Sequence, residues 1–294
     1  MRVIHNVLHY LNHPLGRLNR FATIKRILRW QFGARMLGYD AVVPWVDDTR
    51  LLVRKGMHGA TGNIYVGLME FEDMAFVLHL LRDGDEFLDV GANVGSYSIL
   101  AASRKASVLA IEPVPATYLQ LLDNINLNKA IGQIFQKNIG VGARHGVLQF
   151  STEMGPTNHV LKDNESGGNA VSVAVDALDA IANGWRPIMI KIDVEGFESA
   201  VLNGAVSILA QPSLVAVLIE LNGLGARYGF SDVEIHVKML GLGFSPVMYK
   251  PFERKLVPLH KQNTEGNTLY IRSSDKVSRR LSEARAFCWC GVSI

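Results

Sequence analysis

Four short apolar runs, each followed by a segment with helical periodicity, place the strongest limits on how this chain can fold. The runs span residues 87–90, 108–111, 188–192 and 214–221. Strands that are apolar on both faces are typical of a mostly parallel sheet buried between two layers of helices. We therefore expect an α/β fold that binds its ligands at the carboxyl edge of the sheet, where the strand order reverses.

Helical spacing and turn residues divide the rest of the chain into further elements. Further helices are expected at 22–37, 68–81, 94–103, 116–128, 197–210 and 231–240, the last with a capping box of Ser231 and Glu234. Further strands are expected at 41–46, 51–54, 133–136, 146–151, 170–175, 244–249 and 267–271. Gly56, Gly59 and Gly62 predict a loop, and 152–169 predicts a long polar loop.

This pattern divides the chain into three parts. Residues 1–66 form a basic N-terminal extension of helices and a β-hairpin, 67–272 form the main α/β domain, and 273–294 form a C-terminal tail. With 48% hydrophobic and 19% charged residues over 294 positions, the chain does not fit a disordered, collagen-like or coiled-coil protein.

Neither a membrane span nor a cysteine-based framework is expected. No apolar run reaches the roughly 18 to 20 residues that a membrane span needs. The two cysteines, Cys288 and Cys290, are too few for a disulfide framework or a four-ligand zinc site. This cysteine usage favours a reducing, cytoplasmic location.

Charge is distributed unevenly along the chain. The whole chain carries +3, but residues 1–38 hold seven Lys and Arg residues and no acidic residue, so the other 256 residues carry −4. Polar residues between Asn12 and Arg17 interrupt the apolar run of this segment, which is not the pattern of a secretory signal.

The helix expected at 22–37 has two interpretations. It interleaves basic residues with apolar ones (Ile24, Ile27, Leu28, Met36). Such a helix either packs its apolar stripe on the main domain or contacts an anionic lipid surface. In the second case the protein would bind peripherally at the inner membrane face, where a lipid-linked acceptor is held.

A glycine-containing turn joins the first apolar run to its helix. It reads Asp89-Val-Gly91-Ala92-Asn93-Val-Gly95-Ser96, and Glu112-Pro113 ends the next strand, 21 residues after Gly91. Glycine lets a ligand approach the backbone, and the helix N-terminus offers N–H groups. An acid at this spacing accepts hydrogen bonds from both hydroxyls of an adenosine ribose. These residues are therefore expected to bind a nucleoside cofactor.

Two nucleoside cofactors are considered for this loop. A nicotinamide dinucleotide favours glycine at the first, third and sixth positions, but these are Gly91, Asn93 and Ser96 here. Asp89 at the loop entry also suits a cationic sulfonium better than an anionic pyrophosphate. The loop thus favours S-adenosylmethionine, with an NAD-dependent oxidoreductase as the alternative.

Three segments resemble the FkbM-type methyltransferases. They read Phe87-Leu-Asp-Val-Gly-Ala-Asn-Val-Gly-Ser-Tyr-Ser98, Ile111-Glu-Pro-Val-Pro115 and Lys191-Ile-Asp-Val-Glu-Gly-Phe-Glu198. The resemblance extends over roughly residues 60–272 and implies a Rossmann-like class I methyltransferase fold with a seven-stranded sheet. It also implies S-adenosylmethionine-dependent O-methylation, often of a sugar hydroxyl in a glycan, glycolipid or glycosylated metabolite.

Acidic residues end two of the central strands. Asp193 and Glu195 follow the run 188–192, and Glu220 lies near the end of the run 214–221. Methyl transfer to an alcohol needs alignment of the reactants and a base for the hydroxyl proton. We expect these carboxylates to supply that base or to bind the acceptor, although Glu195 also fits as a helix cap. The three could hold a divalent cation, but the spacing alone does not define a metal site and none is assigned.

His159, in the polar loop, is a further candidate base because its ordinary pKa near 6.5 suits proton transfer, with a surface histidine as the alternative. The expected partner is a small-molecule, glycan or glycolipid acceptor. A nucleic-acid partner is not expected, because the chain outside residues 1–38 is net acidic and lacks an aromatic-rich basic stripe.

Overall fold

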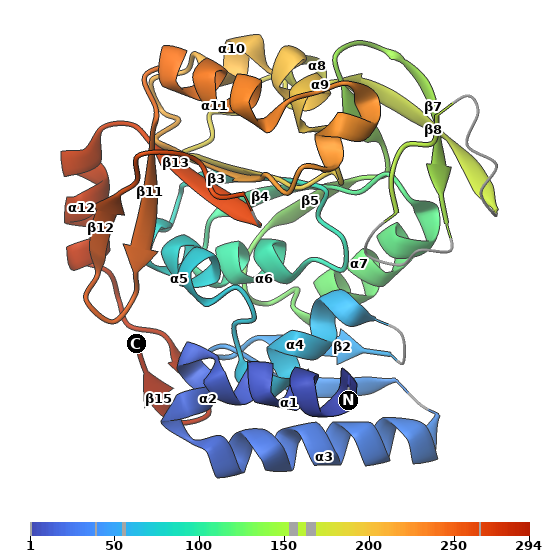
Figure 1. Ribbon diagram of the computed structural model, residues 1–294, viewed down its shortest axis with the longest axis vertical. Coiled ribbons are helices and arrows are strands. Elements are labelled where there is room, and N and C mark those ends of the chain that lie inside the picture. The colour runs from blue at the N-terminus through green and yellow to red at the C-terminus, as the bar shows by residue number, and fades with distance from the viewer. Residues whose placement is uncertain (1, 39, 55–56, 153–157, 163–168, 265) are drawn as a thin grey trace.

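The computed structural model places one large twisted sheet between two layers of helices, with a separate helical layer formed by the N-terminal residues (Figure 1). The structure describes residues 2–38, 40–54, 57–152, 158–162, 169–264 and 266–294. Gly56 and much of the polar loop 152–169 therefore lie outside the described residues.

Eight strands form the large sheet in the order β12-β11-β13-β10-β9-β3-β4-β5. Their bounds are β3 Glu86–Val90, β4 Ser107–Ile111, β5 Ile134–Lys137, β9 Met189–Ile192, β10 Ala216–Glu220, β11 Ser245–Lys250, β12 Lys255–Pro258 and β13 Asn267–Ile271. The strands from β10 to β5 run parallel, whereas β13 is antiparallel to both of its neighbours. The expected α/β fold with a mostly parallel sheet is confirmed.

The expected number of seven strands is wrong by one. The additional strand, β12, pairs antiparallel with β11 at the edge of the sheet, with Lys255 opposite Lys250. It was not expected because Lys255–Pro258 is a short segment of partly exposed residues without a buried apolar face. Only its pairing with β11 identifies it as a strand.

Helices cover both faces of the sheet (Figure 1). One face carries α5 (Phe71–Leu80), α6 (Ser96–Ser103) and α7 (Pro115–Leu127), and the other carries α8 (Leu178–Ile181), α9 (Glu198–Asn203), α10 (Val206–Leu209) and α11 (Asp232–Gly241). Each face of the sheet has its own large apolar core. Central strands such as β9, buried at every position, explain the continuous apolar runs of the sequence.

A small three-stranded sheet, ordered β6-β8-β7, lies beside the carboxyl edge of the large one. Its strands are β6 (Gly140–Gly142), β7 (Gly146–Ser151) and β8 (Ala170–Ala177). The chain enters this sheet after β5 and leaves it before β9. The strands expected at 146–151 and 170–175 are therefore confirmed, but they do not join the main sheet.

The N-terminal residues form a layer of helices below the main domain in Figure 1. It contains α1 (Arg2–Asn12), α2 (Pro14–Leu18), α3 (Arg20–Leu37), α4 (His58–Val66) and the hairpin of β1 (Ala41–Pro44) and β2 (Arg50–Val53). The hairpin and the helix expected at 22–37 are confirmed. The loop expected around Gly59 and Gly62 is wrong, because both residues lie in α4, where Gly62 packs closely against Met69.

Two other expectations about helices are wrong. The helix expected at 197–210 is divided into α9 and α10 at Gly204, where a Cβ atom would lie 2.1 Å from the carbonyl oxygen of Gly142. Close approach to the small sheet thus requires a glycine at a position where a continuous helix was expected. Ser231 does precede α11, but its side chain makes no capping hydrogen bond.

The last 22 residues fold against the body of the protein. They form α12 (Ser274–Ser282) and a ribbon of β14 (Cys288–Trp289) and β15 (Val292–Ser293). Phe287 and Trp289 belong to the same core as Trp45 of the N-terminal layer and Phe87 of β3. The Asp47 carboxylate also accepts a hydrogen bond from the backbone N–H of Cys288. The two ends of the chain thus share one core with the sheet.

Gly91 lies in the turn after β3 and packs against the turn after β9, at the site where ligands are expected. Its φ is +79°, and a Cβ atom there would lie 1.8 Å from the carbonyl oxygen of Asp193. Gly84 has the same type of backbone conformation (φ +80°), but a Cβ atom there would meet nothing within 4 Å. Substitutions at the two positions can therefore be compared: backbone strain is expected at both, and a steric clash only at Gly91.

We expect Gly91→Ala to destabilise the protein much more than Gly84→Ala. The positive φ costs either variant about 1 kcal/mol, and the clash with a backbone atom adds about 1–3 kcal/mol at position 91 alone. Denaturant unfolding of both variants measures the difference. Equal losses of stability would show that the contact between Gly91 and Asp193 is not a steric constraint.

Candidate active site

A cavity of about 280 Å³ lies at the carboxyl edge of the parallel strands. Its lining includes the loop after β3, the ends of β4, β9 and β10, and residues of the small sheet. Six of the eight residues expected to bind the cofactor line it: Gly91, Ala92, Asn93, Ser96, Glu112 and Pro113. The carboxyl edge is where the sequence predicted the site to be.

The other two expected cofactor residues, Gly95 and Asp89, are not among the described residues that line the cavity. Gly95 (φ +91°) precedes α6 and ends the turn. Asp89 is buried, and its Oδ2 accepts a hydrogen bond of 2.6 Å from the Ser98 hydroxyl. Within the described part of the chain, its Oδ1 has no hydrogen-bond partner. The expected direct contact between Asp89 and a sulfonium therefore stays a prediction.

Glu112 is held in a fixed orientation by the backbone. Its Oε2 accepts a hydrogen bond from the N–H of Asn93 and its Oε1 accepts one from the N–H of Val114, each at 3.0 Å. Burial raises the pKa of this carboxyl to about 7, although both hydrogen bonds favour the ionised form. Each oxygen keeps a second lone pair, so the ionised carboxylate can still accept hydrogen bonds from two hydroxyls.

Lys191 is the centre of an ionic network in the wall of the cavity. Its Nζ donates to Asp193 Oδ2 at 2.8 Å and lies 4.9 Å from the centre of the Tyr97 ring, while the Tyr97 hydroxyl donates to Glu70 at 2.5 Å. Burial alone lowers the pKa of Lys191, but the carboxylates of Asp193, Asp89 and Glu70 raise it above its ordinary value. The ammonium therefore stays charged among these acids.

Sequence reasoning gave no role to Lys191, Tyr97 or Glu70. The available signal was Lys191 itself, a charged residue within the otherwise apolar run 188–192. Such a residue is rarely buried without partners of opposite charge. No feature of the sequence indicates that Glu70 and Tyr97 lie near Lys191, because they belong to other elements.

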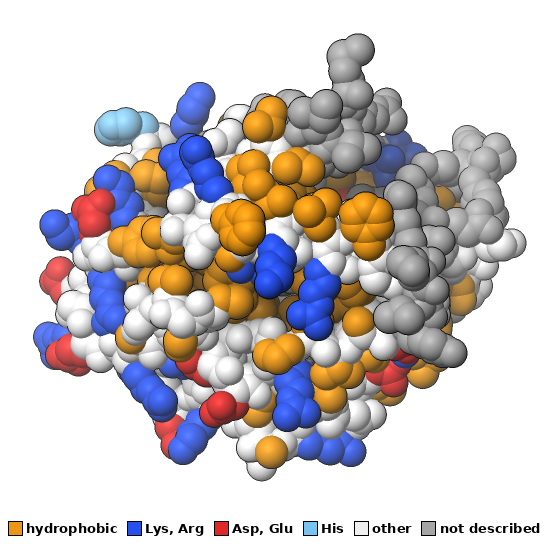
Figure 2. Space-filling model, turned by 90° about the horizontal axis from the view of Figure 1, so that it is seen from below, with side chains coloured by type: hydrophobic (Ala, Val, Ile, Leu, Met, Phe, Trp, Pro, Cys, Tyr) orange, Lys and Arg blue, Asp and Glu red, His pale blue; other side chains and the backbone are white. Residues whose placement is uncertain are grey.

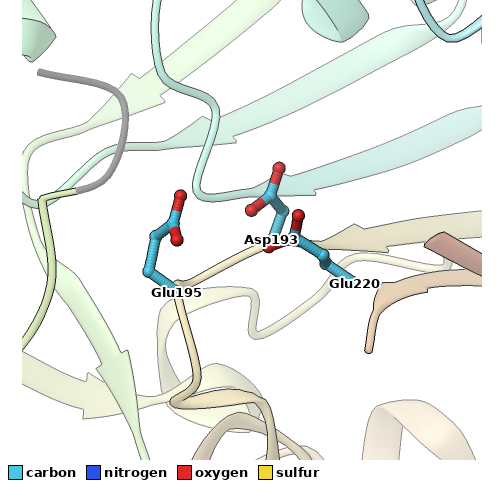
Figure 3. Close-up of side chains that lie close together, drawn as sticks. All are labelled: Asp193, Glu195 and Glu220. Carbon is cyan, nitrogen blue, oxygen red and sulfur yellow. The ribbon is translucent and has the colours of Figure 1, made fainter. Parts of the chain in front are cut away.

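Three of the four expected catalytic residues converge on one point of the cavity. Asp193, Glu195 and Glu220 point toward a common space in Figure 3, and each offers one oxygen within 4.8 Å of the others. Asp193 and Glu195 follow β9, and Glu220 ends the adjacent parallel strand β10. Carboxylate oxygens in this arrangement could bind sugar hydroxyls, a proton or a divalent cation.

Glu195 occupies a backbone conformation that is unusual for a residue with a side chain. Its φ is +55°, and Gly196 follows with φ +98°. The buried Oε1 of Glu198 stabilises this turn by accepting hydrogen bonds from the N–H groups of Val194 and Gly196, each at 3.1 Å. Strained conformations of this kind are concentrated at functional sites. The turn brings the Glu195 carboxylate to the cavity.

The environment raises the pKa of two of these acids, Glu195 and Glu220. Burial raises the pKa of Glu195 to about 7, with further contributions from the Asp193 and Glu198 carboxylates. Burial, and then the carboxylates of Asp193 and Glu195, raise the pKa of Glu220 well above its ordinary value. Asp193, by contrast, is paired with the Lys191 ammonium. At neutral pH, Glu220 is therefore protonated and Glu195 is near its midpoint.

His159 lies in an extended segment beside the cavity wall. Its backbone exchanges two hydrogen bonds of 3.0 Å with Ser151, and its side chain is buried. Asn158 and Val160 line the cavity, but His159 is not among the described lining residues. Alternate residues of an extended segment face opposite sides, which explains this placement.

An aromatic surface completes the cavity. Phe197 lines it beside Phe150, and the Phe197 ring packs edge-on against Tyr228 with 5.2 Å between the ring centres. The Tyr228 hydroxyl donates to the carbonyl oxygen of Val160 at 2.6 Å. A cavity lined by both carboxylates and aromatic rings suits a ligand that has both hydroxyl groups and apolar C–H faces.

Residues 89–246, more than half of the chain, match the profile of the methyltransferase FkbM domain. The chain belongs to the FkbM methyltransferase family. An FkbM methyltransferase uses S-adenosylmethionine as its cofactor, and the NAD-dependent alternative is thereby set aside. The oriented Glu112 carboxylate, the glycine turn and the first turn of α6 are groups that fit a nucleoside with an amino-acid tail.

Curated relatives match parts of this FkbM methyltransferase. The hexuronic acid methyltransferase AglP of Haloferax volcanii is 28% identical over 151 residues, which cover 51% of this chain and 62% of the relative. A tRNA (guanine(37)-N(1))-methyltransferase of Aedes aegypti is 45% identical over 64 residues, which cover 21% of this chain and 11% of the relative. The chain thus spans less than two thirds of both relatives.

Among solved structures, the precorrin-6Y C5,15-methyltransferase of Geobacter metallireducens GS-15 aligns with a TM-score of 0.40 and 12% identity. The alignment covers 70% of this chain and 89% of that structure.

In the part of the FkbM methyltransferase that the structure describes, no helix is long and apolar enough to cross a membrane.

We expect affinity for S-adenosylmethionine to rise with pH between 6 and 8. Only the ionised Glu112 carboxylate accepts from both ribose hydroxyls, and burial raises its pKa to about 7, so acidification through this range protonates it and weakens binding. Glu112→Gln should bind about tenfold more weakly at pH 8, because a charged acceptor is lost, and its affinity should change little with pH. Calorimetric titration at several pH values measures both effects.

Glu198→Gln is the matched control for this prediction. Burial also raises the pKa of Glu198 to about 7, but Glu198 is not among the described residues that line the cavity. One of its oxygens accepts both backbone hydrogen bonds, so a glutamine can keep them. This variant should retain the pH dependence of the wild type. A Glu112→Gln protein with unchanged affinity would contradict the assignment of Glu112 to the ribose.

Proposed function

We propose that this enzyme transfers a methyl group from S-adenosylmethionine to a hydroxyl oxygen of a sugar. The observation that carries the proposal is the convergence of Asp193, Glu195 and Glu220 in a cavity that is also lined by Phe197 and the cofactor loop. Carboxylates accept hydrogen bonds from sugar hydroxyls, and aromatic rings pack against the C–H faces of sugars. The acceptor would be a glycan, a glycolipid or a glycosylated metabolite.

A relative supports a carbohydrate acceptor. The protein from Haloferax volcanii that matches half of this chain is described as a hexuronic acid methyltransferase. The matched region of the FkbM profile, 89–246, includes the cofactor loop and all three converging carboxylates. A sugar or sugar-acid acceptor is therefore the first class of substrate to test.

Glu195 is the proposed general base. The bound cofactor supplies a methyl group that its sulfonium has already activated, so the protein must align the hydroxyl and accept its proton. Efficient general bases have a pKa near the working pH, and the pKa of Glu195 is raised to about 7. Its strained backbone, held by Glu198, keeps the carboxylate at the cavity.

Asp193 and Glu220 then position the sugar. Asp193, paired with Lys191, is an ionised acceptor for a neighbouring hydroxyl. Protonated Glu220 has an O–H donor and can bind a sugar oxygen. Its Oε2 has no hydrogen-bond partner within the described residues, and a bound hydroxyl would supply one. Asp193 thus acts as an acceptor and Glu220 as a donor, while Glu195 takes up the proton of the reacting hydroxyl.

We expect Glu195→Gln to lower kcat by about 100- to 10,000-fold with little change in affinity for S-adenosylmethionine, because a general base contributes a factor of this size. In the wild type, kcat should rise with pH as Glu195 ionises, with its midpoint near pH 7, and level off at higher pH. This rise should be absent from the variant. Incorporation of labelled methyl groups into sugar acceptors, with NMR identification of a methyl ether, provides the assay.

Glu198→Gln, which keeps the backbone hydrogen bonds of the turn, is again the matched control. It should retain the rise of kcat with pH, with the midpoint at lower pH because the Glu198 carboxylate no longer helps to raise the pKa of Glu195. If Glu195→Gln turns over within twofold of the wild type, Glu195 is not the base. If the product carries its new methyl group on nitrogen or carbon, the proposed O-methylation is wrong.

We expect turnover to survive removal of divalent cations. Asp193 is already paired with the Lys191 ammonium, so one of the three carboxylates would have to share its charge between the lysine and a cation. Activity should stay within twofold after dialysis against EDTA. Loss of activity in EDTA that is restored by Mg²⁺ or Ca²⁺ would show instead that the three carboxylates hold a cation.

A further inference from the structure

Helix α3 leaves an apolar face exposed although it packs on the protein through another face. Thr23, Ile27 and Trp30 face inward, where Ile27 packs in a small core with Tyr65 and Val66 of α4. The outward residues are also apolar, with exposed fractions of 79% for Phe21, 38% for Ile24, 50% for Leu28 and 65% for Phe32. Their spacing of three, four and four residues places them on one stripe of the helix.

This finding corrects the simpler interpretation of the sequence. A helix that packs its apolar stripe on the main domain should bury Ile24 and Leu28 together with Ile27, but only Ile27 is buried. Exposed Leu18 at the end of α2 and Leu8 of α1 are further apolar residues of the same helical layer. Contiguous exposed apolar side chains commonly mark a surface that binds a partner.

The charged residues of this layer have one sign. Arg17, Arg20, Lys25 and Arg29 are exposed, and residues 1–38 contain no Asp or Glu. Figure 2 views the molecule from the side of this layer and shows apolar side chains gathered across the face, with Lys and Arg between them. We call this surface, formed by Arg17, Leu18, Arg20, Phe21, Ile24, Lys25, Leu28, Arg29 and Phe32, the α3 face.

We propose that the α3 face binds the surface of an anionic lipid bilayer. Aromatic and aliphatic side chains with interleaved Lys and Arg are the composition of helices that lie in the plane of a membrane interface. The apolar side chains enter the boundary between headgroups and acyl chains, while the basic side chains pair with anionic headgroups. Each basic side chain near such a surface strengthens binding roughly fivefold.

The helix is fixed to the protein in a way that leaves this face available. Arg26, on the inward side, donates to the carbonyl oxygen of Tyr65 at 2.8 Å and lies over the Trp289 ring, and Gln31 donates to the Tyr65 hydroxyl at 2.9 Å. Membrane binding therefore requires no unfolding of α3. In the same layer, the His13 ring is hydrogen-bonded to the carbonyl oxygen of Met69, which lines the cavity, so the layer is bonded directly to the wall of the active site.

Two other occupants suit this surface less well. A nucleic acid would pair with the basic side chains but would leave the four apolar side chains of the stripe without a partner. A second copy of the chain would bring two basic α3 faces together, and the like charges would repel. An anionic bilayer satisfies the charges and the apolar side chains at the same time.

Flotation of the full-length chain with phosphatidylcholine vesicles, with and without phosphatidylglycerol, tests the proposal. The protein should float with the phosphatidylglycerol vesicles and not with the neutral ones. Raised salt should release it, because the screening length falls from about 8 Å at 0.15 M to about 3 Å at 1 M. Lys25→Glu with Arg29→Glu should weaken binding by about 30-fold or more, since two attractions are lost and two repulsions are added.

Matched variants separate the α3 face from general effects of charge and polarity. Phe21→Ser with Phe32→Ser should also weaken vesicle binding at least tenfold, because the apolar contribution is lost. Lys276→Glu with Arg279→Glu makes the same charge change at exposed positions of α12, and Val233→Ser with Val237→Ser makes a similar polarity change on α11. Both controls should float like the wild type, and all four variants should unfold at wild-type temperature because the substituted side chains are exposed.

Four results would overturn the proposal. The first is a wild-type protein that does not float at low salt, and the second is equal flotation with neutral vesicles. The third is equal loss of binding in the α12 or α11 controls. The fourth is a dimer in light scattering, or an RNA complex, that the α3 variants abolish while vesicle binding is absent; this would assign the face to a second copy or to nucleic acid.

Discussion

The buried ammonium of Lys191 is the interaction on which the active site depends. It allows Asp193, Asp89 and Glu70 to lie within one partly buried region, where uncompensated carboxylates would repel one another and take up protons. Lys191 is on the central strand β9, so its position is as rigid as the sheet. The network also reaches α6 and the start of α5 through Tyr97 and Glu70, which ties the cavity wall to the core.

The parallel sheet brings the residues of this site to one edge. Because β3, β4, β9 and β10 all run the same way, the residues that follow them meet at one edge. Gly91 is packed against the carbonyl of Asp193, so the cofactor loop and the acidic turn after β9 are in direct contact. The groups expected to bind the cofactor and those proposed to act on the acceptor therefore share one wall, as an in-line transfer between two bound molecules requires.

The two ends of the chain complete the fold around this centre. Trp45, Phe287 and Trp289 share a core with Phe87 of β3, so the N-terminal layer and the C-terminal ribbon are integral to the packing. Within that layer, α3 is apolar on two sides, one buried against α4 and one exposed beside basic residues. Burial accounts for the first side, and the proposed contact with a bilayer would account for the second.

The sequence by itself determined the order of the main elements, the glycine turn and the acids at the strand ends, because apolar periodicity and turn residues act locally. It also located Glu112, Asp193, Glu195 and Glu220 at one edge, since parallel strands require it. Only the tertiary structure decided what depends on packing and pairing: the division at Gly204, the pairing of β12, the position of His159 outside the described cavity lining, and the Lys191 network. Gly204 approaches Gly142 and Lys191 lies among Asp89, Glu70 and Tyr97, which come from distant parts of the chain, so no local pattern records these contacts.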